Sequence, residues 1–109
     1  MIFTGVRSKG VFCNGKPFSP KRSLKVRNHS PDGFEWGYGG SGPAQLALAL
    51  LLRVVGREKA ESYYHRFKFE VVANFGDTWQ IEELAIKDWV FRLECAMVEI
   101  ARRQTHCPE

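Results

Sequence analysis

Residues 36–52, WGYGGSGPAQLALALLL, decide how this chain folds. A glycine-rich segment leads to Pro43, and the apolar run that follows contains Gln45 as its only polar residue. Proline is favoured in the first turn of a helix, where its missing N–H would have no partner, and a helix that is apolar on all sides belongs in the centre of a domain. The stretch therefore predicts a buried central helix at about 43–55, which Gly56 ends.

The residues before this stretch predict short strands. Residues 2–6, IFTGV, are prone to form a strand, and the Asn-Gly pair at 14–15 is the strongest short signal for a hairpin turn. Pro17 confines the returning strand to a sheet edge, because proline cannot donate a hydrogen bond to the ladder. Polar and apolar residues alternate at 23–28 and again at 34–38, which predicts two further strands.

Two further helices are predicted after the central one. Apolar residues recur at helical spacing over 58–75 and again over 80–104, so Trp79 and Trp89 are expected in the core. The fold class predicted for the single domain, residues 1–109, is α+β. Its N-terminal antiparallel sheet of short strands covers about 1–38, and three C-terminal helices, at about 43–55, 58–75 and 80–104, pack on it.

Charge is distributed unevenly along a chain whose formal net charge is +4. No acidic residue occurs before Asp32, whereas seven basic residues do: Arg7, Lys9, Lys16, Lys21, Arg22, Lys25 and Arg27. A separate positive segment of this kind favours phosphates, nucleic acid or an acidic partner protein. The alternative is a set of exposed basic side chains that only add solubility.

The composition also bounds the setting of the protein. The longest apolar run, residues 46–52, is too short to span a bilayer, and the N-terminus lacks the apolar segment of a secretion signal. A cytoplasmic location without membrane contact is therefore expected. Cys13, Cys95 and Cys107 are an odd and sparse set, which suits free thiols in a reducing compartment. Neither a P-loop nor a dinucleotide-binding motif nor a paired-cysteine motif is present, so no cofactor and no metal are expected.

The glycine-rich segment before the central helix is the candidate binding site. The first turn of a helix has N–H groups without intrahelical partners and carries partial positive charge, and glycines let a phosphate or carboxylate approach the backbone. An aromatic residue would stack on a base, basic residues would neutralise charge, and Gln45 would fix the orientation of the ligand. The predicted contact residues are Trp36, Tyr38, Gly39, Gly40, Ser41, Gly42, Gln45, Arg22, Lys25 and Arg27. The alternative is a connection whose glycines only let the helix sit close to the sheet.

A catalytic interpretation rests on His29, which lies near Asp32 and Glu35 in the sequence. A histidine paired with a carboxylate can transfer protons. However, a Pro-Asp-Gly turn explains Asp32, and bonding to the local backbone explains His29. A metal site made of His29, Asp32 and His65 would need the fold to bring distant residues together. Binding rather than turnover is therefore the expected activity.

The string HSPDGFEWGYGGSGPAQLALALLL at residues 29–52, with FKFEVVANF at 67–75, resembles a family of small domains of unknown function from bacteria, archaea and their phages. The resemblance covers most of the chain and confers no activity. Its phage setting implies a location in the host cytoplasm and a role in counter-defence. The chain departs from the family after Trp89, and residues 90–109 extend the last helix into a candidate surface for homo-oligomerisation.

The sequence therefore predicts a small binding protein that sequesters a phosphorylated ligand, such as a nucleotide signal, through its glycine-rich loop. One alternative is an inhibitor module that binds nucleic acid or an acidic partner protein through the basic N-terminal segment. The other is a small hydrolase that uses His29 with Asp32 or Glu35.

Overall fold

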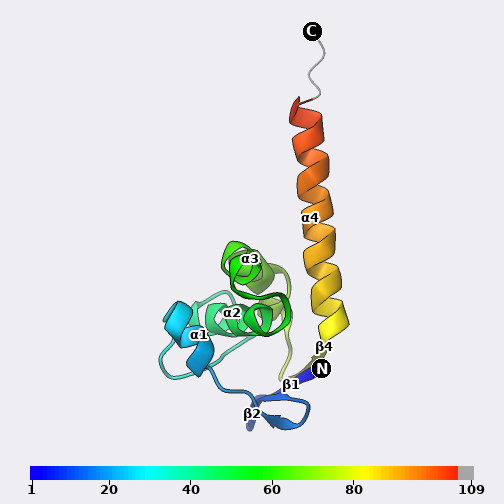
Figure 1. Cartoon of the computed structure of the whole chain (residues 1–109). Coiled ribbons are helices and arrows are strands. Elements are labelled where there is room, and N and C mark those ends of the chain that lie inside the picture. Colours follow the sequence, from blue (N-terminus) through cyan, green and yellow to red (C-terminus); the bar gives the residue numbers. More distant parts are fainter. Residues whose placement is uncertain (106–109) are drawn as a thin grey trace.

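A computed structural model gives the structure of this chain and describes residues 1–105 (Figure 1). Strands and helices follow one another in this order: β1 (Ile2–Val6), β2 (Gly10–Cys13), β3 (Lys16–Pro17), α1 (Lys21–Val26), α2 (Ser41–Val55), α3 (Arg57–Glu70), a 3₁₀ turn (Val72–Asn74), β4 (Thr78–Glu82) and α4 (Glu83–Thr105). An antiparallel sheet and packed helices confirm the α+β prediction. No helix in residues 1–105 is both long and apolar enough to cross a membrane.

The sheet has the order β3-β2-β1-β4, and all of its pairs are antiparallel. Asn14 and Gly15 have φ values of 51° and 81°, the positive values that a tight two-residue hairpin turn requires. Pro17 lies in β3 at the edge of the sheet. The predicted hairpin and the predicted edge position of Pro17 are both confirmed.

The fourth strand, β4, comes from residues that the sequence assigned in part to the last helix. Its residues pair with β1, from Ile2 opposite Glu82 to Val6 opposite Thr78. The side chain of Trp79 is buried on one face, whereas its neighbours on either side are exposed, so the segment has the alternation of a strand. The prediction of a helix over 80–104 is therefore wrong for its first three residues.

The predicted strand at 23–28 is wrong, because this segment belongs mainly to α1. Ser19 Oγ accepts the N–H of Lys21 at 3.2 Å, and Leu24 N donates to Pro20 O at 2.9 Å. Pro20 is thus the N-cap residue of α1, and this helix start overrides the short alternating pattern.

The predicted strand at 34–38 is also wrong, because this segment has no regular secondary structure. Trp36 is buried in the core, and the N–H of Gly37, which has a φ of 88°, donates to Val72 O at 3.1 Å. No strand of the described sheet pairs with this segment, and Trp36 instead packs against Trp79 of β4.

The helix α2 forms the centre of the fold, as predicted. Every residue from Gly42 to Leu52 is buried, and Gly56 ends the helix with a φ of 84°. Figure 1 shows α1, α3 and the sheet arranged around α2, with α4 standing beside them. The predicted helix over 58–75 is shorter than expected, because α3 stops at Glu70 and a 3₁₀ turn follows. Of the two expected core tryptophans, Trp79 is buried and Trp89 is half-buried.

Candidate ligand-binding site

Gln45 anchors the chain that leaves α1. Its side chain is fully buried in α2, and its Oε1 accepts the N–H groups of His29 at 2.8 Å and Ser30 at 3.1 Å. Its Nε2 donates to Ser23 Oγ at 2.8 Å and to Arg27 O at 3.0 Å. Both polar groups of Gln45 are therefore engaged within the protein, and they hold His29 at a fixed place above α2.

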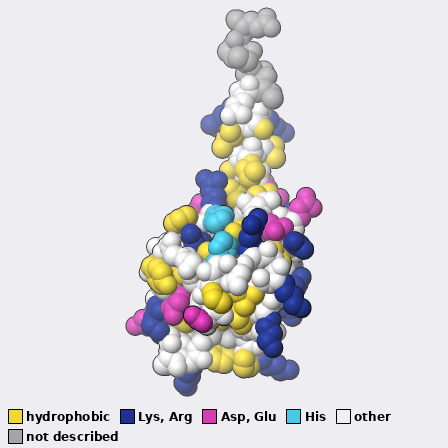
Figure 2. Space-filling model, turned by 90° about the vertical axis from the view of Figure 1, so that its left-hand side faces the viewer, with side chains coloured by type: hydrophobic (Ala, Val, Ile, Leu, Met, Phe, Trp, Pro, Cys, Tyr) yellow, Lys and Arg dark blue, Asp and Glu magenta, His cyan; other side chains and the backbone are white. Residues whose placement is uncertain are grey.

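His29 meets two aromatic residues of α3 at this place. A hydrogen bond of 2.7 Å joins His29 Nε2 and the Tyr64 hydroxyl, and the ring centroids of His29 and His65 lie 5.9 Å apart. Together with Arg27 and Glu61, these residues line an open hollow of about 350 Å³. Figure 2 shows the two histidines side by side on one face, with Lys and Arg side chains around them.

Several basic groups act on His29 in this hollow. Burial lowers the pKa of His29, and the neighbouring His65, Arg27 and Lys68 lower it further. Burial also raises the pKa of Tyr64, so its hydroxyl remains protonated near neutral pH.

The hollow has one carboxylate in its lining, that of Glu61. Arg57 Nε already donates to Glu61 Oε2 at 3.3 Å. The basic groups from the α1 side and from α3 are therefore not neutralised by the protein, and the arrangement favours a bound anion.

The glycine-rich loop meets α3 at Phe69, one helical turn beyond His65 of the hollow. A Cβ added to Gly39 would lie 3.0 Å from the Phe69 ring, and one added to Gly40 would lie 2.5 Å from the Tyr38 ring. Both rings are more than half exposed. Lys68 Nζ lies 4.0 Å above the centroid of the Phe69 ring, so the same lysine that acts on His29 also contacts Phe69.

The first turn of α2 is open at this loop. Gly40 is the N-cap residue, no side chain caps the helix, and the first turn holds no acidic residue. Ser41 is exposed there, whereas Gly42 is buried against Glu35: a Cβ on Gly42 would lie 2.5 Å from Glu35 Cβ. Gly42 therefore permits close packing, as the architectural alternative expects, and Gly39 and Gly40 likewise let the exposed rings of Phe69 and Tyr38 lie close to the backbone.

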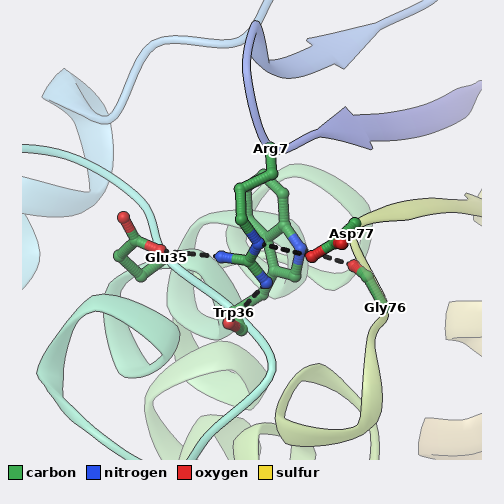
Figure 3. Close-up of polar contacts among 5 residues, drawn as sticks. All are labelled: Arg7, Glu35, Trp36, Gly76 and Asp77. Atoms are coloured by element: carbon green, nitrogen blue, oxygen red, sulfur yellow. Dashed lines mark hydrogen bonds and ion pairs between the residues drawn. The ribbon is translucent and has the colours of Figure 1, made fainter.

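Trp36 lies in a different environment, which Figure 3 shows. Arg7 donates from Nε to Asp77 Oδ1 at 2.8 Å, from Nη1 to Glu35 Oε1 at 3.2 Å and from Nη2 to Trp36 O at 3.3 Å. Its guanidinium lies 4.9 Å above the Trp36 ring, whose Nε1 donates to Gly76 O at 2.7 Å. Trp36 is thus enclosed by the protein, and Tyr38 is the predicted stacking residue that faces solvent.

The predicted basic contact residues are separated by the fold. Arg27 lines the hollow, whereas Arg22 lines a different cavity of about 30 Å³ together with Phe18 and Arg53. Lys25 is exposed on α1 and lines neither.

The predicted catalytic set is not brought together. His29 faces Tyr64 and His65, Glu35 binds Arg7, and the exposed Asp32 makes no polar contact with His29. Within residues 1–105, no three His, Cys, Asp or Glu side chains are grouped closely enough to hold a metal ion.

Sequence reasoning missed three residues that shape this face, Tyr64, Lys68 and Phe69, and it considered His65 only as a possible metal ligand with His29. The sequence offers one local signal for them, which is that Phe69 follows a lysine in a segment with helical periodicity. The structure shows that Phe69 is exposed. Cys13 and Cys95 are free thiols, as expected, and Cys107 lies outside the described residues.

Comparison with known proteins places the chain in a family. No curated protein and no solved structure shows significant similarity to it. The family model of DUF6166, described as a family of unknown function, matches residues 3–92. The match includes both the hollow and the glycine-rich loop. Because it spans well over half of the chain, this protein belongs to the DUF6166 family.

Proposed function

We propose that this protein binds a small phosphorylated ligand, most simply a nucleotide, on the face shared by the hollow and the glycine-rich loop. The observation that carries the proposal is the convergence of Arg27, His29 and His65 on one hollow whose single carboxylate is already paired, with Lys68 close enough to act on His29. A phosphoryl group accepts hydrogen bonds from arginine, histidine and lysine side chains, and its negative charge offsets the positive charges of Arg27 and Lys68.

The position of Lys68 extends the site from the hollow to the loop. Its ammonium group lowers the pKa of His29 and lies above the Phe69 ring, and that ring lies next to Gly39. A nucleotide with its phosphates in the hollow would reach Phe69 or Tyr38 with its base, and stacking on such exposed rings is worth about 1–3 kcal/mol per base. The open first turn of α2 would add backbone donors for a second phosphate.

Sequestration is the form of function that this site supports best. Binding alone would lower the free concentration of a nucleotide signal, and the phage setting of the resembling family suits such a counter-defence role. The hydrolase alternative lacks support, because His29 faces Tyr64 and His65 and has no contact with Asp32 or Glu35.

A thermal-shift screen, followed by calorimetric titration, tests the proposal. The panel contains inorganic phosphate and mono-, di- and cyclic nucleotides. A ligand at about 100 times its dissociation constant adds roughly 2.7 kcal/mol, which raises the Tm of a domain of this size by several degrees. We expect Arg27→Gln to weaken binding about tenfold, as loss of one charge-assisted hydrogen bond would.

Arg22→Gln is the matched control, because it removes the same charge from the other exposed arginine of this region without touching the hollow. We expect it to bind the ligand as the wild type does. Equal losses of affinity in both variants would mean that only overall charge matters and would contradict a site in the hollow. The absence of any Tm shift across the panel would overturn the proposal.

A second candidate function uses the basic N-terminal surface. Lys9, Lys16, Lys21, Arg22 and Lys25 are exposed, and none of them forms an ion pair with another described residue. Such side chains suit the phosphate backbone of a nucleic acid. Salt concentration distinguishes the two candidate functions. The affinity for the phosphate backbone of a nucleic acid falls steeply between about 50 and 200 mM salt, whereas the affinity for a nucleotide in the hollow should fall much less.

A further inference from the structure

The second half of α4 extends beyond the body of the molecule (Figure 1). The body holds the helix as far as Glu94, which accepts hydrogen bonds from Lys59 Nζ at 3.1 Å and from the Tyr63 hydroxyl at 3.0 Å. Every residue from Cys95 to Gln104 is exposed. At about 1.5 Å per residue, this segment is roughly 15 Å long, or about three turns.

An apolar stripe runs along the helix from the core into this segment. Its members recur at alternating intervals of four and three residues, which is the spacing of a coiled-coil seam: Ile86, Val90, Leu93, Met97 and Ile100. Ile86 and Val90 are buried, whereas Met97 and Ile100 are 46% and 54% exposed. Figure 2 shows apolar side chains gathered on the protruding helix. The monomer therefore buries only the first half of a continuous seam.

A hollow beside α4 continues this seam at the body. It has a volume of about 310 Å³ and lies between α3 and α4. Trp89, Leu93 and Ala96 form its apolar wall, and its rim is polar. A second helix lying along the protruding half of α4 would end in this hollow.

The order of charges along this half of α4 indicates what that second helix is. Glu94, bound to Lys59, stands just before the protruding segment, Glu99 follows with an exposed ion pair to Arg103 at 3.5 Å, and Arg102 and Arg103 stand at the basic end. Two copies of the segment in opposite directions place the basic end of each beside the acidic start of the other. Parallel copies would place like charges together, which is unfavourable.

We propose that a second copy of this chain docks on the protruding half of α4, in an antiparallel pair formed through Leu93, Met97 and Ile100. Such a contact is isologous and closes on itself, so it stops at a dimer. Three turns of helix bury less than the roughly 1,200 Å² of a standard interface, so dissociation in the micromolar range is expected. The family match ends at residue 92, so this contact is an addition to the matched domain.

Sedimentation velocity of the full chain, from about 1 μM to about 500 μM, tests the dimer. The wild type is expected to approach twice the monomer mass as its concentration rises, whereas Ile100→Glu, which places a charge in the seam, is expected to remain a monomer. Val98→Glu is the matched control, because Val98 is 56% exposed and projects from the opposite side of the helix. Circular dichroism checks that each variant is folded.

A monomeric wild type at the highest concentration would overturn the proposal. Dissociation by Val98→Glu with a dimer retained in Ile100→Glu would overturn it as well, because the seam would then lie on the other side.

Disulfide formation tests the orientation, with Cys95 and Cys107 first replaced by serine. In the antiparallel pair, position 93 of one copy lies near position 104 of the other. A mixture of Leu93→Cys and Gln104→Cys variants should therefore form mixed dimers on oxidation. Cross-links that form only within each variant would show parallel packing and overturn the antiparallel assignment.

Discussion

Gln45 is buried in α2, and both polar groups of its side chain hold the segment that follows α1. Gln45→Leu preserves most of the volume but leaves the N–H groups of His29 and Ser30 and the carbonyl of Arg27 without partners. Each such loss costs about 1–3 kcal/mol when the group is buried; because these groups are only partly buried, we expect a total loss of about 2–4 kcal/mol of unfolding free energy. Urea unfolding measures it.

Gln80→Leu is the control for this prediction, because Gln80 is exposed on β4 and its replacement should change stability by less than about 0.5 kcal/mol. An equally small effect of Gln45→Leu would mean that water replaces the lost bonds and that His29 is not positioned by Gln45.

The protonation of His29 makes stability depend on pH. Burial lowers its pKa in the folded protein, and the nearby His65, Arg27 and Lys68 add to this effect. The unfolded chain therefore binds this proton more readily than the folded protein does. The stability that neutral His29 contributes is complete above the unfolded pKa of about 6.5 and is lost as the pH falls below it. Tyr64 and Glu61 also face the ring, but Tyr64 stays neutral over this range.

We expect the Tm of the wild type to fall between about pH 7.5 and about pH 5.5, and to fall less in His29→Gln, which cannot be protonated. Thermal unfolding followed by circular dichroism at each pH provides the measurement. Carboxylates elsewhere titrate in both proteins, so the difference between the two slopes isolates His29. Identical slopes would show that His29 takes no part in the acid sensitivity.

The strand β4 pairs with β1 along its length, and the register places Trp79 opposite Gly5. A Cβ on Gly5 would overlap the Trp79 ring. Gly5→Ala must therefore displace a buried indole, and we expect it to lower the free energy of unfolding by about 1–3 kcal/mol, the usual effect of overpacking. Urea unfolding tests this, with Gly76→Ala as the control.

At Gly76 the nearest atom to an added Cβ is 3.8 Å away, so the control should be neutral or slightly stabilising. A stabilising Gly5→Ala would mean that the ring moves freely and that the close contact of Trp79 with Gly5 contributes nothing to stability.

Local chemistry is enough to predict some of these elements. The Asn-Gly pair at 14–15 predicts the hairpin, and the apolar run from Ala44 predicts α2, because a tight turn and a buried helix each depend on neighbouring residues only. The strand β4 could not be predicted in this way, since its pairing partner β1 lies more than 70 residues earlier in the chain. For α1, the Ser-Pro start at 19–20 was the deciding signal, and the alternation that follows it is too short to outweigh it.

The residues of the candidate site also differ in whether the local sequence could predict them. Tyr38 and Arg27 can be assigned from the sequence, because a loop before a helix and a basic segment are visible there. His65, Lys68 and Phe69 come from α3, and they reach the site because α2 and α3 pack side by side after the sharp turn at Gly56. Only tertiary packing places α3 against His29, so no local pattern could have indicated these three residues.

Arg7 joins parts of the molecule that are distant in the sequence (Figure 3). It leaves the end of β1 and binds both the segment that crosses the helices, at Glu35 and Trp36, and the approach to β4, at Asp77. Its charge therefore serves the fold, unlike that of the exposed lysines of α1. The basic N-terminal segment thus contains one structural cation, and its other cations are free to meet a partner.

The different roles of Arg7 and the exposed lysines predict opposite results when each is replaced by glutamine. Arg7→Gln should lower the free energy of unfolding by about 1–2 kcal/mol, a range reduced from the sum of its bonds because the pairs are partly exposed. Lys25→Gln should change stability by less than about 0.5 kcal/mol, because Lys25 is exposed on α1. If the basic surface binds nucleic acid, Lys25→Gln should weaken binding of a DNA or RNA duplex and reduce its salt dependence, while a folded Arg7→Gln should bind normally. Urea unfolding and duplex titration at two salt concentrations measure these effects. The reverse pattern would mean that Arg7 acts as a binding cation and that its contacts in Figure 3 contribute little to the fold.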